Sequence, residues 1–448
     1  MDRPLCLVVL AAGQGSRMKS QLPKVLHKVA GRPMIDHVLA AGAQLNPEKV
    51  VVVVGPGMAA LEAAVAPHVT ALQAERRGTA DALKAARDAL SAEISSAADV
   101  LVLYGDGPLI TAETLMDLRD VAREEEADFV WLSFQADDPS GYGRMIHDDS
   151  GQLLRIVEEK EASAAQRSVD LCWSGLMLGR ADVLFDLLEK VDNDNAKGEY
   201  YLTQLVQIAN DYQLKVVSTE APEDEILGVN SRRELAVAEA VMQDRLREAA
   251  MDRGATLIDP TTVWLSWDTQ LGEDVIVGPN VHFGPRVVVG HDVEIRAFCD
   301  LEDCRIDDGA RVGPFARLRA GAQLGAGAQV GNFVEIKNAK LGPGAAALHL
   351  SFIGDASVGR GSTIGAGSIT CNYDGVKKSF TEIGDDVLVG SNSALVAPVK
   401  VGDGALIGAG STITRDVEAD ALSLARARQE DRPGAAKTHR QARATKQE

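Results

Sequence analysis

The chain has 448 residues, a formal net charge of −19 and only 4% aromatic residues. This length predicts about two or three domains. With 46% hydrophobic and 25% charged residues, the composition is that of a globular protein and excludes wholesale disorder. The acidic balance argues against a general nucleic-acid or membrane-surface binder, because like charges repel. The 42 glycines are unevenly placed, since residues 272–410 hold 24 of them, which indicates two architectures in one chain.

The start of the chain does not have the pattern of an export signal. The apolar run from Leu5 to Ala12 precedes Arg17 and Lys19, whereas a secretory peptide places its basic residues first. No apolar stretch approaches the roughly 20 residues that span a bilayer. The five cysteines are scattered and form no C-x-x-C pair, so neither a zinc knuckle nor a disulfide framework is indicated. We expect a cytoplasmic protein without a membrane partner.

The first half of the chain alternates predicted strands with predicted helices. Residues 5–10 (LCLVVL) form a short apolar run of the kind that is buried on both faces of a sheet. Further strands are predicted over 50–54, 100–104 and 129–134, and helices over Thr79–Leu90 and Thr111–Glu125. This alternation predicts an α/β domain with a mostly parallel sheet and a ligand site at the carboxyl ends of its strands.

A glycine loop follows the first predicted strand, with Gly13 and Gly15 in the sequence AAGQGSRM. It is not a dinucleotide fingerprint, because Met18 stands where the third glycine belongs. Backbone N–H groups of such a loop still approach phosphates closely, and Arg17 and Lys24 add positive charge just beyond it. The loop and its two cations together predict a phosphate site.

Asp106 and Asn230 each have two possible roles. Asp106 closes a predicted strand opposite the phosphate loop, where a carboxylate can bind Mg²⁺ together with substrate phosphates, although an isolated aspartate there is more often a turn cap. Asn230 precedes a strong helical pattern in which Ser231 and Glu234 form a capping box. The residues alone favour Asn230 as part of the helix cap.

The glycine-rich second half is a hexapeptide repeat. An aliphatic or aromatic residue recurs every six positions, apart from a few shorter or offset steps. The in-phase positions are Leu271, Val277, Phe283, Val289, Ile295, Leu301, Ile306, Val312, Leu318, Leu324, Val330, Ile336, Leu341, Ile353, Val358, Ile364, Ile383, Val389, Leu395, Val401, Ile407 and Ile413. This period predicts a parallel β-helix with one continuous core. Interruptions at Gly342–Phe352 and Thr370–Thr381 are the expected functional segments.

Two sets of sequence strings resemble known families. The strings LAAGQGSRM, LPKVLH, GTADAL, LYGDGPLI, GYGR, VEEK, EYYLT and GVN resemble the sugar-nucleotide pyrophosphorylases. Adding RLRAG, GNFVEIKNAKLG, HLSFIGD, IGAGSITCNYDG, VGSNSALVAPV and RDV makes nearly the whole chain similar to a bacterial bifunctional family. That family joins an N-acetylglucosamine-1-phosphate uridyltransferase to a glucosamine-1-phosphate N-acetyltransferase, whose reactions together make UDP-N-acetylglucosamine for cell-wall precursors.

This resemblance implies an α/β Rossmann-like domain, a helical linker, a left-handed parallel β-helix and a homotrimer. The implied boundaries are 1–229 for the uridyltransferase domain, 230–250 for the linker, 251–425 for the acetyltransferase β-helix and 426–448 for a basic flexible tail. The left hand of the β-helix comes from the resemblance alone, because it departs from the usual crossover rule.

For uridylyl transfer, the resemblance implies UTP as donor, N-acetylglucosamine-1-phosphate as acceptor and Mg²⁺ bound by Asp106 and Asn230, with capping left to Ser231. Substrate contacts are implied for Leu10, Ala11, Ala12, Gly13, Lys24, Gln73, Gly78, Thr79, Tyr104, Gly105, Asp106, Gly143, Glu158 and Asn230. The sugar-phosphate oxygen displaces pyrophosphate from the α-phosphorus, so catalysis requires positioning and charge neutralisation. Arg17 and Lys24 are the expected catalytic cations.

For acetyl transfer from acetyl-CoA to glucosamine-1-phosphate, the resemblance implies His349 as the general base, a role that suits the pKa of imidazole. Glu335 is its expected orienting partner, and the N–H groups around Gly365–Gly367 are expected to stabilise the oxyanion. Sugar-phosphate contacts are implied for Arg319 and Lys337, which without the motif would be interpreted as solvated coil corners. Acetyl-CoA contacts are implied for Ala366, Asn372, Tyr373, Ser391, Ala409 and Arg426.

The sequence departs from the family pattern at several implied site positions. Trp173 stands where the family has asparagine, Phe352 stands for tyrosine and Thr363 for asparagine, and Arg76 and Asp81 replace the usual residues of the uracil loop. Two alternatives therefore remain open at this point. The chain could be a nucleotidyltransferase with a structural or regulatory β-helix, or an impaired homologue that acts as a binding scaffold.

Overall fold

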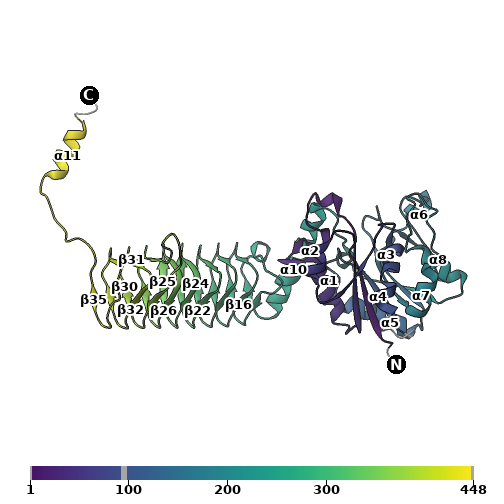
Figure 1. The fold of residues 1–448 in the computed structure, drawn as a ribbon, viewed down its shortest axis with the longest axis horizontal. Helices are drawn as coiled ribbons and strands as arrows, with labels where there is room; N and C mark the ends of the chain where they lie inside the picture. The colour runs from purple at the N-terminus through teal and green to yellow at the C-terminus, as the bar shows by residue number, and fades with distance from the viewer. Residues whose placement is uncertain (1–2, 92–97, 445–448) are drawn as a thin grey trace. The chain divides into compact units, whose positions relative to one another are not determined.

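The computed structural model describes residues 3–91 and 98–444 (Figure 1). The chain divides into two compact units, Met1–Arg245 and Leu246–Glu448. The last four residues of the predicted tail, 445–448, lie outside the described residues. No helix in the described part of the chain is both long enough and apolar enough to cross a membrane.

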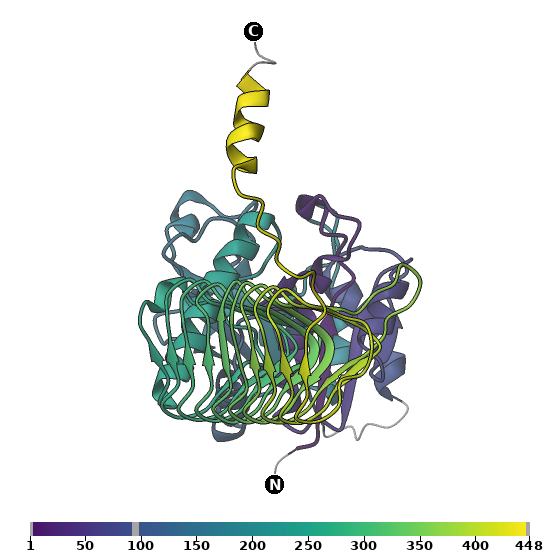
Figure 2. The same ribbon diagram turned by 90° about the vertical axis from the view of Figure 1, so that its left-hand side faces the viewer.

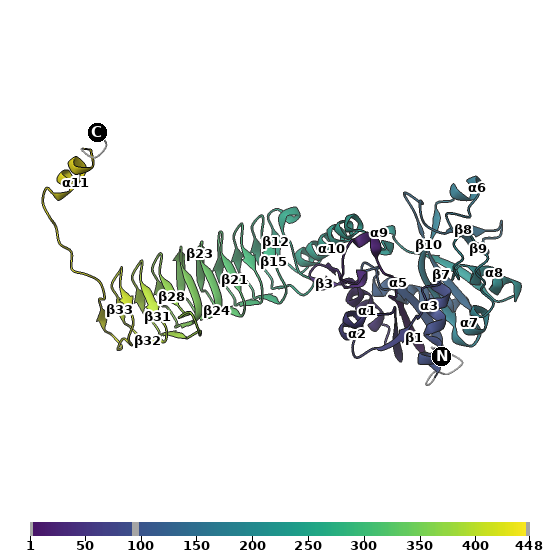
Figure 3. The ribbon, with the colours of Figure 1, turned by 45° about the horizontal axis from the view of Figure 1, so that its top comes forward.

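The first unit contains a sheet whose strands lie in the order β11–β7–β10–β6–β1–β4–β5. Figure 3 labels β1, β7 and β10 of this sheet, with α5 (Ala112–Glu124) beside them. Their bounds are β1 (Leu5–Leu10), β4 (Lys49–Val54), β5 (Val69–Leu72), β6 (Asp99–Tyr104), β7 (Phe129–Gln135), β10 (Leu171–Arg180) and β11 (Val216–Glu220). β1 pairs in parallel with β4 and β6, whereas β10 is antiparallel to β6 and β7. The strands predicted over 5–10, 50–54, 100–104 and 129–134 are all present.

Helices cover both faces of this sheet, which explains why its central strand β1 is buried on both sides. Leu7 of β1 packs in the same cluster as Ile35, and its neighbour Val8 packs in another cluster with Leu83. The helices of this unit are α1 (Met34–Ala43), α2 (Ala59–Ala64), α3 (Thr79–Ala85), α4 (Arg87–Ser91), α5 (Ala112–Glu124), α6 (Ala164–Arg167), α7 (Ala181–Leu188), α8 (Gln204–Asp211) and α9 (Glu223–Ile226). A hairpin of β8 (Arg144–His147) and β9 (Leu153–Val157) adjoins β10.

Of the two helices predicted in this unit, one is present as a single helix and the other is broken into two. The helix predicted over Thr111–Glu125 is present as α5, and the Thr111 side chain caps it by accepting from the N–H of Thr114. The helix predicted over Thr79–Leu90 is broken at Ala86 into α3 and α4. A longer helix, α10 (Arg232–Asp252), follows them and carries the chain from one unit into the next.

The second unit is a stack of coils built from short parallel strands (Figure 2). One ladder runs through β12 (Thr256–Leu257), β14 (Ile276–Val277), β17 (Glu294–Ile295), β20 (Arg311–Val312), β23 (Gln329–Asn332), β25 (Ala346–His349), β27 (Thr363–Ile364), β30 (Leu388–Val389), β33 (Leu406–Ile407) and β35 (Leu422–Ser423). The remaining strands are β13 (Gln270–Leu271), β15 (His282–Phe283), β16 (Val287–Val289), β18 (Asp300–Leu301), β19 (Cys304–Ile306), β21 (Arg317–Arg319), β22 (Ala322–Leu324), β24 (Glu335–Leu341), β26 (Phe352–Val358), β28 (Ile369–Cys371), β29 (Thr381–Ile383), β31 (Ala394–Val396), β32 (Val399–Val401) and β34 (Thr412–Ile413). This is the parallel β-helix that the hexapeptide period predicts.

The in-phase residues of the repeat fill the core of the β-helix, with Leu271 packed against its edge. The prediction that the coil is interrupted at Gly342–Phe352 is wrong, however. Ala347 is fully buried between Leu341 and Ile353 and pairs in register with Val330 and Ile364, so the period of six continues through it. An alanine in the inward position hid the repeat from a search for large aliphatic residues.

The second interruption is a true loop, although it begins later than predicted. Thr370 is buried and keeps the coil register with Leu395, and the chain leaves the coil only after Cys371. The loop closes on an isolated antiparallel bridge between Tyr373 and Lys378. Beyond β35 the chain continues into the predicted tail, where α11 (Ala435–Ala444) is exposed along its whole length.

Candidate functional site

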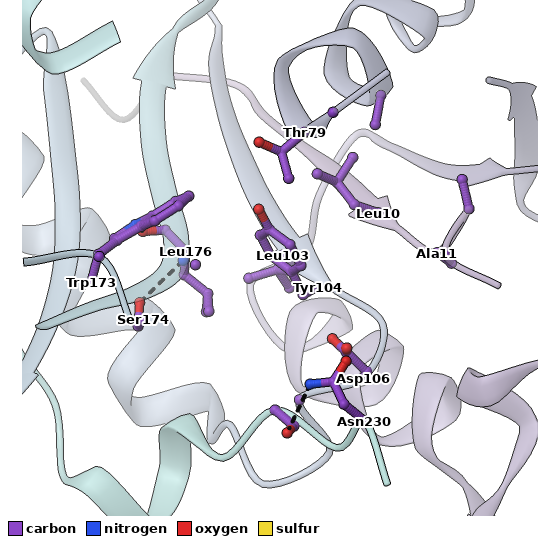
Figure 4. Close-up of a pocket in the computed structure, with 18 of the residues that line it drawn as sticks. Leu10, Ala11, Thr79, Leu103, Tyr104, Asp106, Trp173, Ser174, Leu176 and Asn230 are labelled. Carbon is purple, nitrogen blue, oxygen red and sulfur yellow. Dashed lines mark hydrogen bonds between the residues drawn. The ribbon is translucent and has the colours of Figure 1, made fainter. Parts of the chain in front are cut away.

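A cavity of about 490 Å³ lies in the first unit, where β1 and β6 end (Figure 4). It is bordered by the glycine loop after β1, by the segment around Asp106 after β6, and by the chain that leads into α10. Every residue predicted to contact the nucleotide or sugar lines this cavity except Gly105. Gly105 instead donates its N–H to the carbonyl of Leu10, and so ties the ends of β1 and β6 together.

Three polar side chains from distant parts of the sequence meet at one edge of the cavity. The ammonium of Lys24 is 2.7 Å from the carboxamide oxygen of Asn230 and also contacts the carboxylate of Asp106. The side chains of Lys24 and Asp106 are only 11% and 15% exposed. The oxygen atoms of Asp106 and Asn230 therefore converge on the Lys24 ammonium, as the ligand atoms of a hard metal ion converge on the ion.

The competing roles of Asn230 are resolved by its neighbours. Ser231 accepts from the N–H of Glu234 at 3.3 Å, and Glu234 accepts from the N–H of Asn230 at 2.6 Å. Ser231 and Glu234 thus form the cap of α10, while the carboxamide of Asn230 is left to face Lys24. Asn230 is thus part of the helix cap through its backbone N–H, whereas its side chain contacts Lys24.

The two predicted cations of the phosphate loop occupy different positions. Lys24 reaches the cavity because Gly15 has a φ of +62° and no side chain; a Cβ there would lie 2.6 Å from Cβ of Lys24. Arg17 is exposed and does not belong to the described lining. Arg76, noted above only as a departure from the family, does line the cavity, and its Nε donates to the carbonyl of Ala12 at 2.7 Å. Arg76 is exposed like Arg17, but of the two it is Arg76 that borders the cavity in this structure.

Aromatic residues form the wall opposite the glycine loop. The indole of Trp173 packs edge-to-face with Tyr104 at 6.4 Å between ring centroids, and tilted against Trp131 at 5.5 Å. Its N–H donates to the carbonyl of Leu176 at 3.2 Å, so Trp173 offers the cavity an apolar surface. Figure 4 shows Trp173 and Leu10 on opposite sides of Tyr104.

Burial changes the acid–base properties of two lining residues. It raises the pKa of the Tyr104 phenol, which therefore stays neutral. It also raises the pKa of the Glu158 carboxyl, although a hydrogen bond from the Thr203 hydroxyl at 3.1 Å opposes this shift. Glu158 remains an acceptor in a partly desolvated part of the cavity.

In the second unit, the predicted acetyltransferase residues lie on successive coils. His349 is exposed at the end of β25, where it pairs in register with Asn332 of the preceding coil. Nδ1 of His349 is 2.6 Å from the carboxamide oxygen of Asn332. A carboxamide oxygen can only accept, so this contact favours the tautomer with the proton on Nδ1, and Nε2 has no hydrogen bond within the described residues.

One expectation about this second site is wrong, and a second is narrowed to a single residue. Glu335 does not orient His349, because its carboxylate accepts from Nε of Arg319 at 2.7 Å. Of the expected oxyanion donors, Gly365 donates to the carbonyl of Val389 and Gly367 to that of His349, and both bonds join neighbouring coils. Ala366 is the member of this trio whose N–H finds no acceptor among the described residues.

The structure brings most of the other predicted residues of this site near one another. Lys337 pairs in register with Arg319. Ser391 and Ala409 follow Ala366 on the next coils at the same corner. Asn372 donates to Asp355, which also accepts from Asn338 at 2.6 Å; burial raises the pKa of the Asp355 carboxyl, but these hydrogen bonds lower it below its ordinary value.

The remaining predicted residues are peripheral or packed. Tyr373 is 60% exposed in the loop after β28, and Arg426 is exposed beyond β35. Phe352, where the family has tyrosine, lies over Gly354, where a Cβ would be 2.5 Å from its ring. Thr363 pairs with Ala346 and Leu388 in the ladder of β27.

Comparison with known proteins matches both units. A model of the MobA-like NTP transferase domain matches residues 7–255, and the bacterial transferase hexapeptide model matches residues 268–299 and 380–415. The "Bifunctional protein GlmU" of Paramagnetospirillum magneticum is 52% identical over 99% of this chain and 98% of its own. The protein of the same name from Rhodospirillum rubrum is 55% identical over 95% of both chains.

The chain belongs to the GlmU family. It is therefore a bifunctional transferase, with a nucleotidyltransferase half and a hexapeptide acyltransferase half. Neither a purely structural β-helix nor a non-catalytic scaffold is supported by full-length similarity to bifunctional relatives. The sequence analysis missed Asn332, whose carboxamide oxygen contacts His349. The repeat contained a signal for it, because Asn332 precedes His349 by 17 residues, close to the length of one coil.

Proposed function

We propose that this protein makes UDP-N-acetylglucosamine by two reactions at separate sites. The second unit transfers the acetyl group of acetyl-CoA to glucosamine-1-phosphate, and the first transfers a uridylyl group from UTP to the N-acetylglucosamine-1-phosphate formed. The observation that carries the first activity is the convergence of Lys24, Asp106 and Asn230 at the edge of the cavity. Assays of pyrophosphate release with UTP and of thiol release with acetyl-CoA test the two reactions separately.

Asp106 and Asn230 would hold Mg²⁺, a role that fits their two oxygen atoms aimed at one cation. The ion supplies neutralisation of negative charge on the triphosphate when it is bound. Among the described residues no cluster of three or more His, Cys, Asp or Glu exists, so phosphates and water would complete the coordination. Lys24 and Arg76 add positive charge on the loop side, and the N–H groups around Gly13 approach the phosphates.

His349 acts as general base in the proposed acetyl transfer. Asn332 holds the imidazole with its proton on Nδ1, so that Nε2 can accept a proton from the amine of glucosamine-1-phosphate as that amine attacks the thioester. Arg319 and Lys337 lie side by side on neighbouring coils and provide positive charge for the sugar phosphate. The N–H of Ala366 is the proposed oxyanion donor.

Trp173 is the proposed contact for the sugar in the uridylyl transfer site. With the phosphates on the glycine loop and the base near Gln73, the remaining wall is that of Trp173, Gly143 and Glu158. We expect Trp173→Ala to raise the KM for N-acetylglucosamine-1-phosphate about five- to tenfold, the value of one aromatic contact, with the KM for UTP unchanged. Trp173→Phe should retain part of the contact, and an unchanged sugar-phosphate KM in both variants would contradict this role.

We propose that the β-helix forms a homotrimer through an exposed apolar ladder. Phe298, Phe315 and Phe333 stack at 4.8 and 5.1 Å between ring centroids, and Leu350 follows on the next coil. All four side chains are 44–63% exposed, and all four residues have positive φ. This backbone region favours asparagine or glycine, so bulky apolar residues there indicate a surface that packs against another copy.

A substitution at this ladder separates folding from assembly. Phe333→Asn suits the left-handed backbone of the turn, so we expect an intact fold. Loss of the ring should shift the molar mass measured by light scattering from that of a trimer towards that of a monomer. A trimer that persists in both Phe333→Asn and Phe315→Asn would refute the interface.

The five cysteines are free thiols, which supports a cytoplasmic location for this protein.

A further inference from the structure

The side chain of Gln73 is a fixed part of the wall of the nucleotide site. Gln73 follows β5 directly, and its N–H donates to the carbonyl of Val54 at 2.9 Å. It lines the cavity but is only 5% exposed, so its carboxamide presents a single edge to a ligand. Which atom stands at that edge, nitrogen or oxygen, decides what the wall can recognise.

Two acceptors settle the orientation of the Gln73 carboxamide. Nε2 donates to the carbonyl of Gly78 at 3.0 Å and to Oδ2 of Asp81 at 2.9 Å. Neither a carbonyl nor a carboxylate oxygen can donate, so the nitrogen end must face them and both of its N–H groups are used. Oε1 accepts no hydrogen bond within the described residues. It is nevertheless absent from the fully buried polar atoms that lack a partner, so it keeps some accessible surface. It is therefore open to the cavity.

Asp81 is itself held in place. It lies in the first turn of α3 with its side chain 17% exposed, and NH2 of Arg77 is 3.5 Å from its Oδ1. Its two oxygens thus take different partners, Arg77 on one side and Gln73 on the other. Asp81 does not belong to the described lining of the cavity, so any effect on a ligand passes through Gln73.

We propose that Asp81 is a positioning residue that makes this site select uracil over cytosine. The inference rests on the proposed uridylyl transfer and deepens it. By holding Nε2, Asp81 leaves Gln73 with an acceptor alone facing the base. Uracil presents an N–H at ring position 3, whereas cytosine, of the same shape, presents a lone pair there. With cytosine in the site, Oε1 of Gln73 would face that lone pair, and no hydrogen bond could form. A site built around one hydrogen bond rejects an analogue that cannot make it.

The test compares UTP with CTP as donors for the full-length protein, with N-acetylglucosamine-1-phosphate and Mg²⁺. We expect wild type to prefer UTP, and Asp81→Ala to reduce the ratio of kcat/KM for UTP to that for CTP about tenfold, because a charged acceptor of Gln73 is lost. Asp81→Asn should reduce the ratio less, since asparagine offers Gln73 either an acceptor or a donor. The KM for the sugar phosphate should not change in either variant.

The controls separate positioning from general damage. Asp117→Ala removes an exposed acid from α5 and should leave the UTP-to-CTP ratio at the wild-type value. Acetyl transfer, measured in the same preparations, reports that the protein is intact. An unchanged ratio in both Asp81 variants, or an equal fall with UTP and CTP, would overturn the inference. Wild type without any activity towards UTP would overturn the proposed uridylyl transfer instead.

Discussion

His349→Ala should abolish acetyl transfer and leave uridylyl transfer at the wild-type rate. Removing a positioned general base costs about 10²- to 10⁴-fold in rate, because no other group accepts the proton as the amine attacks. His349 is exposed in the second unit, so its replacement leaves no cavity in the core and does not touch the nucleotide cavity in the first unit. Thiol release from acetyl-CoA and pyrophosphate release from UTP, measured on one preparation, check this expectation.

Asn332→Ala is the companion variant. It keeps the imidazole but removes the acceptor that fixes its tautomer. We expect a partial loss of acetyl transfer, because the imidazole is no longer held in place through Nδ1. Glu335→Gln is the matched control, since Glu335 bonds to Arg319 rather than to His349; it should alter the KM for glucosamine-1-phosphate and leave kcat unchanged. Equal loss of both activities in His349→Ala would refute the two-site assignment.

Asp106→Asn should reduce uridylyl transfer by at least about 10²- to 10³-fold while acetyl transfer stays at the wild-type level. Asparagine has nearly the shape of aspartate, so the cavity keeps its form, but the negative charge beside Lys24 is lost. We expect the half-maximal rate to require a higher concentration of Mg²⁺, because the carboxylate is the stronger of the two proposed ligands. Pyrophosphate release titrated with Mg²⁺ measures both effects.

A control for this substitution is available on the same domain. Asp117→Asn changes an exposed acid of α5 by the same chemistry and should leave the rate and its Mg²⁺ dependence unaltered. Lys24→Met provides a second comparison, since it removes the ammonium but retains the oxygen atoms of Asp106 and Asn230. Full uridylyl transfer by Asp106→Asn would show that the convergence of Lys24, Asp106 and Asn230 is not the site of reaction.

The regular parts of this fold were predictable because their signals are local. A strand buried on both faces needs a continuous apolar run, so residues 5–10 predict β1 by themselves. A β-helix needs one inward residue per side, so the period of six predicts the coils. The prediction failed at Ala347, where the inward residue is too small to stand out among alanines and glycines, although its backbone pairing is unchanged.

The partners of the site residues were not predictable, since they are set by packing across long separations. Lys24 and Asn230 are 206 positions apart and meet only because α10 begins beside the end of β6. Glu335 and Asn332 lie almost equally near His349 in sequence, yet the coil register gives Asn332 to His349 and Glu335 to Arg319.

The sequence by itself thus determined the two architectures, the order of their elements and the kinds of side chain available for chemistry. Periodicity and apolar runs follow from local backbone geometry, which each short segment expresses independently. Tertiary structure alone decided which side chains share a proton or a cation, and which atom of Gln73 faces the cavity. Those choices depend on distances of about 3 Å between residues far apart in the chain, and only the packed fold sets such distances.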